Sequence, residues 1–198
     1  LNHDIIPVIP QKGSVGARGD LAPLSHLALA IIGEGSVWGD QGEVPVHSQL
    51  QKKSVQALEL QAKEGLSMIH GCQVMTAVGL LNLYKARRLM WLGDLSGAMT
   101  LEALKGARSA FDPLIAATRP HPGEAKTARN LLRLMGETSA IAESHQDCGR
   151  VQDAYSLRCI PAVHGAAKDS FRHVLKVLET EANSSTDNPL VFAEDGKV

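Results

Sequence analysis

The spacing of apolar residues predicts a helix near the start of the chain. Between residues 20 and 33, apolar side chains recur three and four positions apart, as on one face of an α-helix. Asp20 stands where an N-cap is expected and Gly33 where a helix stops, while Pro23 is tolerated because it falls in the first turn. The apolar positions are Leu21, Leu24, Leu27, Ala28, Ile31 and Ile32.

The pattern then changes from a period of three or four to a period of two. Residues 36–47, SVWGDQGEVPVH, alternate and contain the turn residues Gly39, Asp40 and Gly42. This pattern is typical of a β-hairpin. We expect it to be a decoration on the surface.

A long helical pattern follows, from Ser54 to about Arg108. It carries few charges before Lys85, which predicts a helix that is buried on nearly every side. Gly93 and Asp94 predict a break in that helix.

The remainder of the chain is predicted to be helical with loops between. The segments are a proline-rich loop over 111–126, a short helix over 124–136 ending at Gly136, a region without clear period over 137–162, a helix over 163–183, and the turn sequence NSSTDNP. The resulting fold class is mainly α, a bundle of long helices with one small β-hairpin.

Composition and charge are ordinary for a globular protein. The 198 residues are 44% hydrophobic and 21% charged, with a net charge of −1, so neither nucleic acid nor an anionic membrane surface is indicated as a partner. No secretory signal and no apolar run of about 18 residues are apparent in the sequence. We expect a cytoplasmic protein whose two ends are extended segments of a longer chain.

The three cysteines, Cys72, Cys148 and Cys159, are far apart and odd in number. Neither a disulfide framework nor a zinc site has this spacing, so we expect no metal. Each cysteine is predicted to be a small buried apolar residue.

The stretch GSVGARGD, residues 13–20, places a glycine-rich loop before the first helix. Such a loop can bind phosphate at a helix N-terminus, but neither of the two common phosphate-loop motifs is present. A tight turn before a buried helix is the simpler interpretation. It leaves the number of glycines unexplained.

Two other places carry polar side chains suited to chemistry. In VQDAYSLRCIPAVHG, residues 151–165, Gln152, Tyr155 and Arg158 are close in sequence and suit the orientation of a carboxylate, although a structural polar cluster has the same composition. His70 lies in an apolar segment, where a histidine either bonds to the backbone in the core or faces a cavity.

Four segments together resemble the aromatic amino-acid ammonia-lyases, and among them the histidine ammonia-lyases most closely. They are GSVGARGDLAPLSH, KEGLSMIHGCQ, VQDAYSLRCIPAVHGA and ETEANSSTDNPLVF. Because they occur in the order of that family and span nearly the whole chain, the resemblance implies the central core of a longer lyase. It implies the helical bundle fold that ammonia-lyases share with fumarase.

In that family an Ala-Ser-Gly tripeptide cyclises into a methylidene-imidazolone, the electrophile that the substrate attacks. The position of this tripeptide is occupied here by Ala17, Arg18 and Gly19. Serine supplies the hydroxyl whose loss creates the methylidene carbon, and arginine has no such hydroxyl. We therefore expect no cofactor in this chain.

The resemblance assigns further roles position by position. Gln152, Arg158 and Asn188 match substrate-binding residues, and Tyr155 matches a catalytic one. The family's catalytic base is a tyrosine upstream of this sequence, so no residue here takes that role.

Two more positions depart from the family pattern. His70 stands where the family has an asparagine that touches the electrophile, and Ala162 replaces a glutamine. With Arg18, these departures fall on or beside functional positions, as in a disabled or degenerate relative.

The resemblance implies elimination of ammonia from L-histidine to give urocanate, in a homotetramer, by a protein that is inactive as written. One alternative is a non-catalytic helical scaffold that self-associates through the apolar residues 66–92. Another is a lyase of the fumarase type without the prosthetic group, with His70 or Tyr155 as base.

Overall fold

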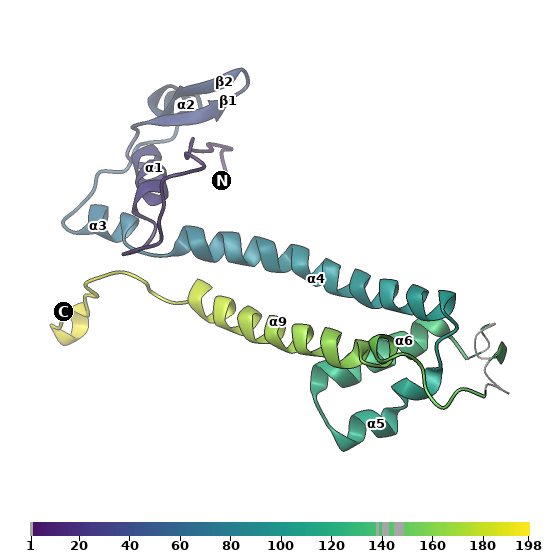
Figure 1. Ribbon diagram of the computed structural model, residues 1–198. Coiled ribbons are helices and arrows are strands. Elements are labelled where there is room, and N and C mark those ends of the chain that lie inside the picture. The colour runs from purple at the N-terminus through teal and green to yellow at the C-terminus, as the bar shows by residue number, and fades with distance from the viewer. Residues whose placement is uncertain (1, 138, 140–142, 145–148) are drawn as a thin grey trace. The chain divides into compact units, whose positions relative to one another are not determined.

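The computed structural model describes residues 2–137, 139, 143–144 and 149–198, and this part of the chain is mostly helical (Figure 1). The chain divides into two compact units. The first unit comprises Leu1–Gly79 and Thr180–Val198, and the second unit comprises Leu80–Glu179. The helix α4 (Gln73–Ala103) begins in the first unit, and α9 (Ile160–Ala182) ends in it.

The first unit contains short elements joined by loops. Besides the ends of α4 and α9, they are α1 (Leu21–Ile31), β1 (Ser36–Gly39), β2 (Gly42–Pro45), α2 (Val46–Lys52), α3 (Glu64–Ile69) and the 3-10 turn η2 (Ala193–Asp195). The helix predicted over 20–33 is thereby confirmed, with Asp20 at its N-cap position. Ala30 of this helix packs in a buried cluster with Val37 of the hairpin, whereas Leu21, Leu27 and Ile31 are exposed.

The hairpin is present as predicted, but it is not a mere decoration of the surface. The strands β1 and β2 pair antiparallel, with Val37 opposite Val44. Val37 and Val46 are fully buried in a cluster with Ala30 and Leu50. Because the hairpin supplies part of the core of the first unit, the expected surface role was wrong.

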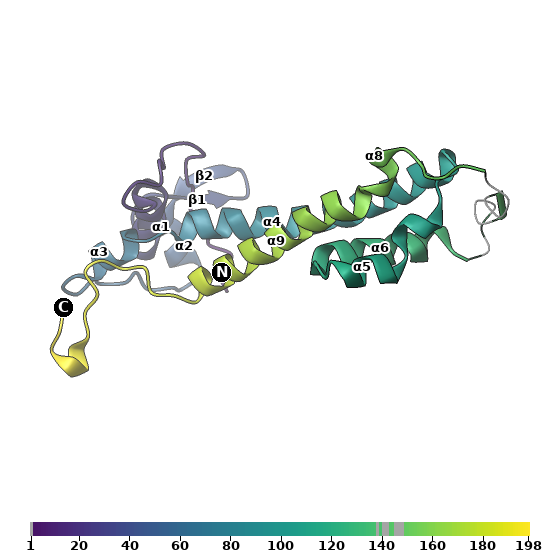
Figure 2. The same cartoon turned by 60° about the horizontal axis from the view of Figure 1, so that its bottom comes forward.

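The second unit is built on helix packing. Its elements, apart from α4 and α9, are the 3-10 turn η1 (Arg108–Phe111), α5 (Pro113–Thr118), α6 (Pro122–Met135) and α8 (Tyr155–Arg158). Within this unit α4 and α9 run side by side, and α6 packs against α9 (Figures 1 and 2). The core consists of Ala98, Leu101, Phe111, Ala128, Leu131, Met135, Leu157 and Ile160.

The contact between α6 and α9 depends on two glycines. A Cβ atom on Gly123 or on Gly165 would overlap the backbone of the other helix. The two helix backbones therefore approach more closely than any residue with a side chain would allow. The predictions of α6, which ends before Gly136, and of α9 are both confirmed.

The predictions for residues 54–108 need two corrections. Residues 55–63 are not helical, and α4 continues through Gly93 and Asp94 without a break. Local propensity disfavours those two residues in a helix, but tertiary contacts decide here: Gly93 lies against His164, and Asp94 binds a lysine of α9.

The helix α4 is also far less buried than predicted. In the second unit Leu81, Tyr84 and Leu89 of this helix are 65%, 77% and 65% exposed. The reason is that α6 and α9 cover only one side of α4 within this chain. Many of its apolar side chains therefore have no cover among the described residues.

Three short helices were not predicted, namely α2, α5 and α8. Within the expected loop 111–126, Pro113 opens α5, and the Asp112 carboxylate accepts a hydrogen bond from the backbone N–H of Leu114 at 2.8 Å. The helix α8 lies in the segment without period. Cys72 and Cys159 are half-buried rather than buried, and Cys148 lies outside the described residues.

Candidate functional site

The glycine-rich loop of the first unit forms a compressed turn at the tripeptide position. Arg18 and Gly19 both have left-handed backbone angles, with φ of 62° and 91°. A non-glycine residue pays a steric penalty in this region, so the turn around Arg18 must be held by its surroundings. Ala17 and Arg18 are both exposed.

The turn is held against the segment that precedes α4. The N–H of Asp20 donates to the carbonyl oxygen of Gly71 at 2.8 Å. A Cβ on Gly19 would lie 2.5 Å from that same oxygen, so only glycine permits this contact. The number of glycines in the loop thus has a structural explanation at this position.

Asp20 connects the loop to the start of α4. The buried carboxylate of Asp20 accepts hydrogen bonds from the Ser14 hydroxyl at 2.9 Å and from the backbone N–H of Met75 at 2.8 Å. Asp20 occupies the N-cap position of α1, yet its side chain caps α4 instead. The start of α4 is therefore stabilised from a distant part of the sequence.

A third segment, residues 186–188, completes the site. The Asn188 carbonyl oxygen lies 2.7 Å from Nδ1 of His70. Because a carbonyl oxygen only accepts, Nδ1 of His70 carries a proton, and Nε2 of the neutral ring is left as an acceptor. The amide of Gln73 donates to the Thr186 hydroxyl at 3.2 Å.

Asp187 fastens this segment to α3. The Asp187 carboxylate is paired with the Lys63 ammonium and accepts a hydrogen bond from the Ser67 hydroxyl at 2.8 Å. The hydrogen bonds from Lys63 and Ser67 lower the pKa of Asp187 below its ordinary value. The carboxylate is therefore ionised in the working pH range, and the attachment is intact there.

These segments enclose a cavity of about 260 Å³ in the first unit, which we call the loop cavity. It is lined by Arg18, Gly19, His70, Gly71, Cys72, Met75, Thr186 and Asn188. The structure thus brings four of the predicted site residues together: Arg18, Gly19, His70 and Asn188. Gly71, Cys72, Met75 and Thr186 were missed because their types carry no functional signal on their own.

Cys72 is a thiol in this cavity. Its Sγ donates to the Glu181 carboxylate at 2.8 Å. That hydrogen bond, and then burial, raise the pKa of the Cys72 thiol above its ordinary value. The Cys72 thiol is therefore harder to deprotonate than an ordinary cysteine, which argues against a nucleophilic role.

Of the other predicted residues, Ala17 lies in the same turn of the first unit, and Gln152, Tyr155 and Arg158 lie in the second unit. The Arg158 guanidinium lies 5.6 Å from the centre of the Tyr155 ring, and its Nε donates to the Asp153 carbonyl oxygen at 2.8 Å. Tyr155 is 72% exposed, and Gln152 and Ala162 are exposed as well. Tyr155 and Arg158 thus form one pair on α8.

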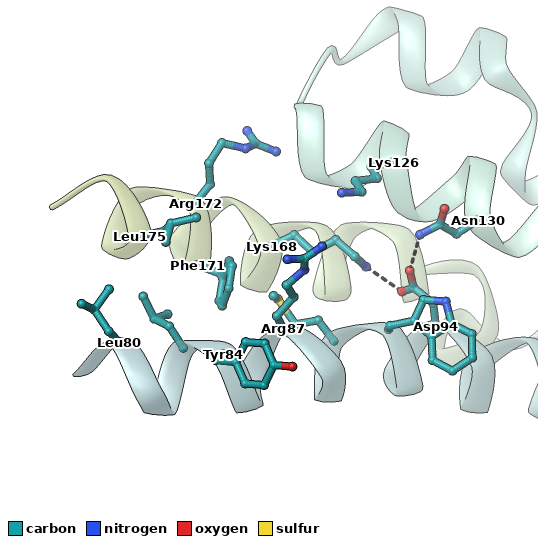
Figure 3. Close-up of a pocket in the computed structure, with 13 residues that line it drawn as sticks. Leu80, Tyr84, Arg87, Asp94, Lys126, Asn130, Lys168, Phe171, Arg172 and Leu175 are labelled. Atoms are coloured by element: carbon teal, nitrogen blue, oxygen red, sulfur yellow. Dashed lines mark hydrogen bonds and ion pairs between the residues drawn. The ribbon is translucent and has the colours of Figure 1, made fainter. Parts of the chain in front are cut away.

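The second unit also has a groove of about 700 Å³ beside α4, α6 and α9, shown in Figure 3. At its floor the Lys168 ammonium lies 2.6 Å from the Asp94 carboxylate, and Asn130 donates to the same carboxylate at 2.7 Å. Lys168 also donates to Thr127, and His164 lies 3.2 Å from Asp94. Asp94 is only 1% exposed, so this cluster is a buried ion pair with satisfied hydrogen bonds.

Neither a metal site nor a clear membrane segment emerges from the described residues. In the part of the chain that the structure describes, no three His, Cys, Asp or Glu side chains are grouped to hold a metal ion. One helical stretch there, Glu64–Ala103, is long and apolar enough to cross a membrane by length and composition alone, against our expectation that no such run exists. Core helices of soluble proteins have the same composition.

The tripeptide position does not fit a methylidene-imidazolone. The turn has left-handed backbone angles at Arg18 and Gly19, and the side chain at its centre is a guanidinium on a methylene stem. Arg18 offers no β-hydroxyl to eliminate. The side-chain chemistry at this residue therefore does not fit the group.

Comparison with known proteins gives a consistent result. The family model for aromatic amino acid lyases matches residues 1–198. A histidine ammonia-lyase of Gloeobacter violaceus is 51% identical over 198 residues, which are 100% of this chain and 38% of that protein. One of Myxococcus xanthus is 48% identical over 100% of this chain and 39% of its own length.

Solved structures show the same likeness. The crystal structure of histidine ammonia-lyase from Trypanosoma cruzi has a TM-score of 0.80 and 39% identity, and covers 96% of this chain and 34% of that one. Phenylalanine ammonia-lyase from Rhodosporidium toruloides has a TM-score of 0.83 and 31% identity, and covers 98% and 30%. The chain thus spans less than half the length of the relatives it matches.

Proposed function

Since the chain belongs to the aromatic amino acid lyase family, we propose that it is the core segment of a larger histidine ammonia-lyase-like protein that is catalytically silent. The relatives named as histidine ammonia-lyases, at about half identity over the whole chain, support the histidine assignment. In this proposal residues 1–198 form one part of the enzyme core, and further parts precede and follow it.

The proposed lack of catalytic activity rests on the arginine at the tripeptide position. Elimination of ammonia in this family depends on an electrophile formed from the chain itself. Without the hydroxyl of a serine, Arg18 prevents that group from forming. Loss of the electrophile removes the reaction path rather than a part of the transition-state stabilisation.

The remaining family positions are proposed to keep their substrate-binding character. Arg158 offers a guanidinium for the carboxylate of an amino acid, with Tyr155 beside it. Gln152 and Asn188 complete the polar contacts. The proton-abstracting base is proposed to come from a tyrosine outside residues 1–198.

Assembly and location follow the family in this proposal. We expect a cytoplasmic homotetramer without an external cofactor, and with neither nucleic acid nor membrane as a partner. The exposed apolar side chains of α4 support burial by other parts of such an assembly, because large apolar surfaces are seldom left open to water.

Turnover of L-histidine tests the silent state. We expect no urocanate, measured by its ultraviolet absorbance, from the whole protein as it occurs. The triple variant Arg18→Ser, His70→Asn, Ala162→Gln restores the family residues and is expected to gain activity. The matched control Arg18→Lys keeps the other departures and stays silent. Turnover by the unchanged protein, or silence of the triple variant, contradicts the proposal.

A second candidate is a non-catalytic scaffold that self-associates through α4. The exposure of Leu81, Tyr84 and Leu89 in the second unit favours it. Light scattering tests the self-association: a scaffold forms a defined oligomer that Leu81→Glu dissociates. The urocanate assay of the triple variant then distinguishes a scaffold, which stays inactive, from a lyase core. A monomer that stays soluble contradicts this candidate.

A lyase without the prosthetic group is a third candidate because His70, whose Nδ1 bonds to the Asn188 carbonyl oxygen, lines the loop cavity. A general base must reach the proton it removes. This candidate requires turnover of histidine, tyrosine or phenylalanine by the unchanged protein. Loss of that turnover in His70→Gln or Tyr155→Phe identifies the base.

A further inference from the structure

We propose that the loop cavity binds a small carboxylate, held by the Arg18 guanidinium and the His70 imidazole. The two residues come from separate segments of the first unit and line the same cavity of about 260 Å³. The inference goes beyond the proposed function, because it holds whether or not the longer protein turns over an amino acid. In this proposal the positive charge of Arg18 takes the place that the electrophile occupies in the family.

Arg18 supplies the permanent positive charge. It stands in the left-handed turn between Ala17 and Gly19, and the bond from Asp20 to the Gly71 carbonyl holds that turn in place. Within the described part of the chain, no carboxylate pairs with the Arg18 guanidinium. The planar guanidinium presents parallel N–H groups that match the two oxygens of a carboxylate.

His70 supplies the second contact. Its Nδ1–H is already donated to the Asn188 carbonyl oxygen, which fixes the ring and leaves Nε2 for a ligand. A neutral Nε2 accepts hydrogen bonds, whereas a protonated one donates to an anion. The protonated imidazole is the form that can donate from Nε2 to a carboxylate.

The carboxylates of the protein around the cavity are already engaged. Asp20 accepts from Ser14 and from the Met75 amide, and Glu181 accepts from Cys72. Asp187 is paired with Lys63. Since each of the three anions has its own donors, Arg18 remains available to a ligand.

The surroundings favour an organic anion over a bare phosphate. Gly19 and Gly71 bring no side chains into the cavity, and Met75 contributes a thioether as an apolar wall. One guanidinium and one imidazole satisfy the two oxygens of a carboxylate, while a phosphate has further oxygens that need donors. We therefore assign a carboxylate.

Calorimetric titration of the whole protein with acetate tests this assignment. Acetamide, which has the same shape without the charge, and inorganic phosphate are the comparison ligands. Saturable binding of acetate is expected, at least about tenfold tighter than that of acetamide, since hydrogen bonds to charged groups are the strong ones. Tighter binding of phosphate than of acetate overturns the carboxylate assignment.

Three variants locate the site. Arg18→Gln is expected to weaken acetate binding about tenfold or more, and Arg18→Lys, which keeps the charge but not the planar donor pair, to weaken it less. His70→Gln, which removes the imidazole contact, is also expected to weaken acetate binding. Arg87→Gln, which removes an exposed cation from the second unit, is the matched control and leaves binding unchanged.

Unchanged acetate affinity in Arg18→Gln, an equal loss in Arg87→Gln, or no saturable binding overturns the proposal. Circular dichroism verifies that each variant is folded. These results are measured by ligand binding and do not depend on whether the protein produces urocanate. Failure of this inference is therefore distinguishable from failure of the proposed function.

Discussion

The two units of the chain are held together in different ways. In the first unit, loops meet through backbone contacts that glycine allows and through short polar bonds, such as those of Asp20 and Asp187. In the second unit, helices pack around an apolar core and one buried ion pair, Lys168 with Asp94. The loop cavity lies in the first unit, among the loops that these contacts hold together.

This difference separates the candidate loop site from the apolar helical core. Loops held by a few directional contacts can place Arg18, His70 and Asn188 around a cavity, because each contact positions a particular atom. Packed helices stabilise the fold, but their packing restricts the positions that side chains can take. Changes in the second unit are therefore expected to affect the folding free energy most, and changes in the first unit to affect the loop cavity.

The largest effect is expected from removing the buried cation of the second unit. Lys168→Ala leaves Asp94 charged and buried, which destabilises a protein by about 3–5 kcal/mol. Denaturant unfolding measures the loss. Lys126→Ala, an exposed lysine of α6, is the matched control and is expected to change stability by less than about 0.5 kcal/mol.

A double variant separates the charge from the packing. If the unpaired charge is responsible, adding Asp94→Asn to Lys168→Ala recovers part of the lost stability. No recovery would show that the lysine stem, and not the ion pair, holds the helices together.

A smaller effect is expected in the first unit from Gly19→Ala. The new Cβ meets the Gly71 carbonyl oxygen and takes a left-handed backbone angle. Together the clash and the strain are expected to destabilise by about 2–4 kcal/mol. Gly42→Ala has a similar angle, φ 123°, but open space, so it tests the strain alone at about 1–2 kcal/mol.

Hydrogen exchange at the Asp20 amide reports whether the loop detaches. Faster exchange in Gly19→Ala, with normal exchange in Gly42→Ala, is the expected pattern. Equal exchange in both variants would mean that the close approach to Gly71 does not hold the turn.

The smallest effect concerns the pH dependence of the Asp187 attachment. Because the pKa of Asp187 is lowered in the fold, its contribution is present above the pKa of the unfolded chain and is lost as pH falls through the folded pKa. Lys63→Met removes the ion pair and is expected to raise the pKa of Asp187 toward its ordinary value. Titration of the Asp187 carboxyl carbon by NMR measures this, and an unchanged pKa contradicts it.

Local sequence patterns predicted the elements whose signals are local. The helix α1 has its apolar period and Asp20, and α6 has Gly136 after its last residue. The continuity of α4 could not be predicted in this way, because contacts with α9 stabilise Gly93 and Asp94 within the helix. Those contacts join residues 74 positions apart, as between Asp94 and Lys168.

The candidate site, too, could be predicted from the sequence only in part. The resemblance to known lyases indicated Arg18, Gly19, His70 and Asn188, and the structure places these four around one cavity. Residue type alone left His70 ambiguous between core and cavity. Gly71 and Thr186 could not be predicted, since their importance arises only when the loops meet.

The intact mass of the whole protein tests the central claim most directly. If Arg18 prevents ring formation, the measured mass equals the mass encoded by the sequence, with no loss of water. A mass lower by one water would show that the backbone at Ala17, Arg18 and Gly19 has cyclised, since arginine has no hydroxyl to lose as a second water, and would contradict the proposal.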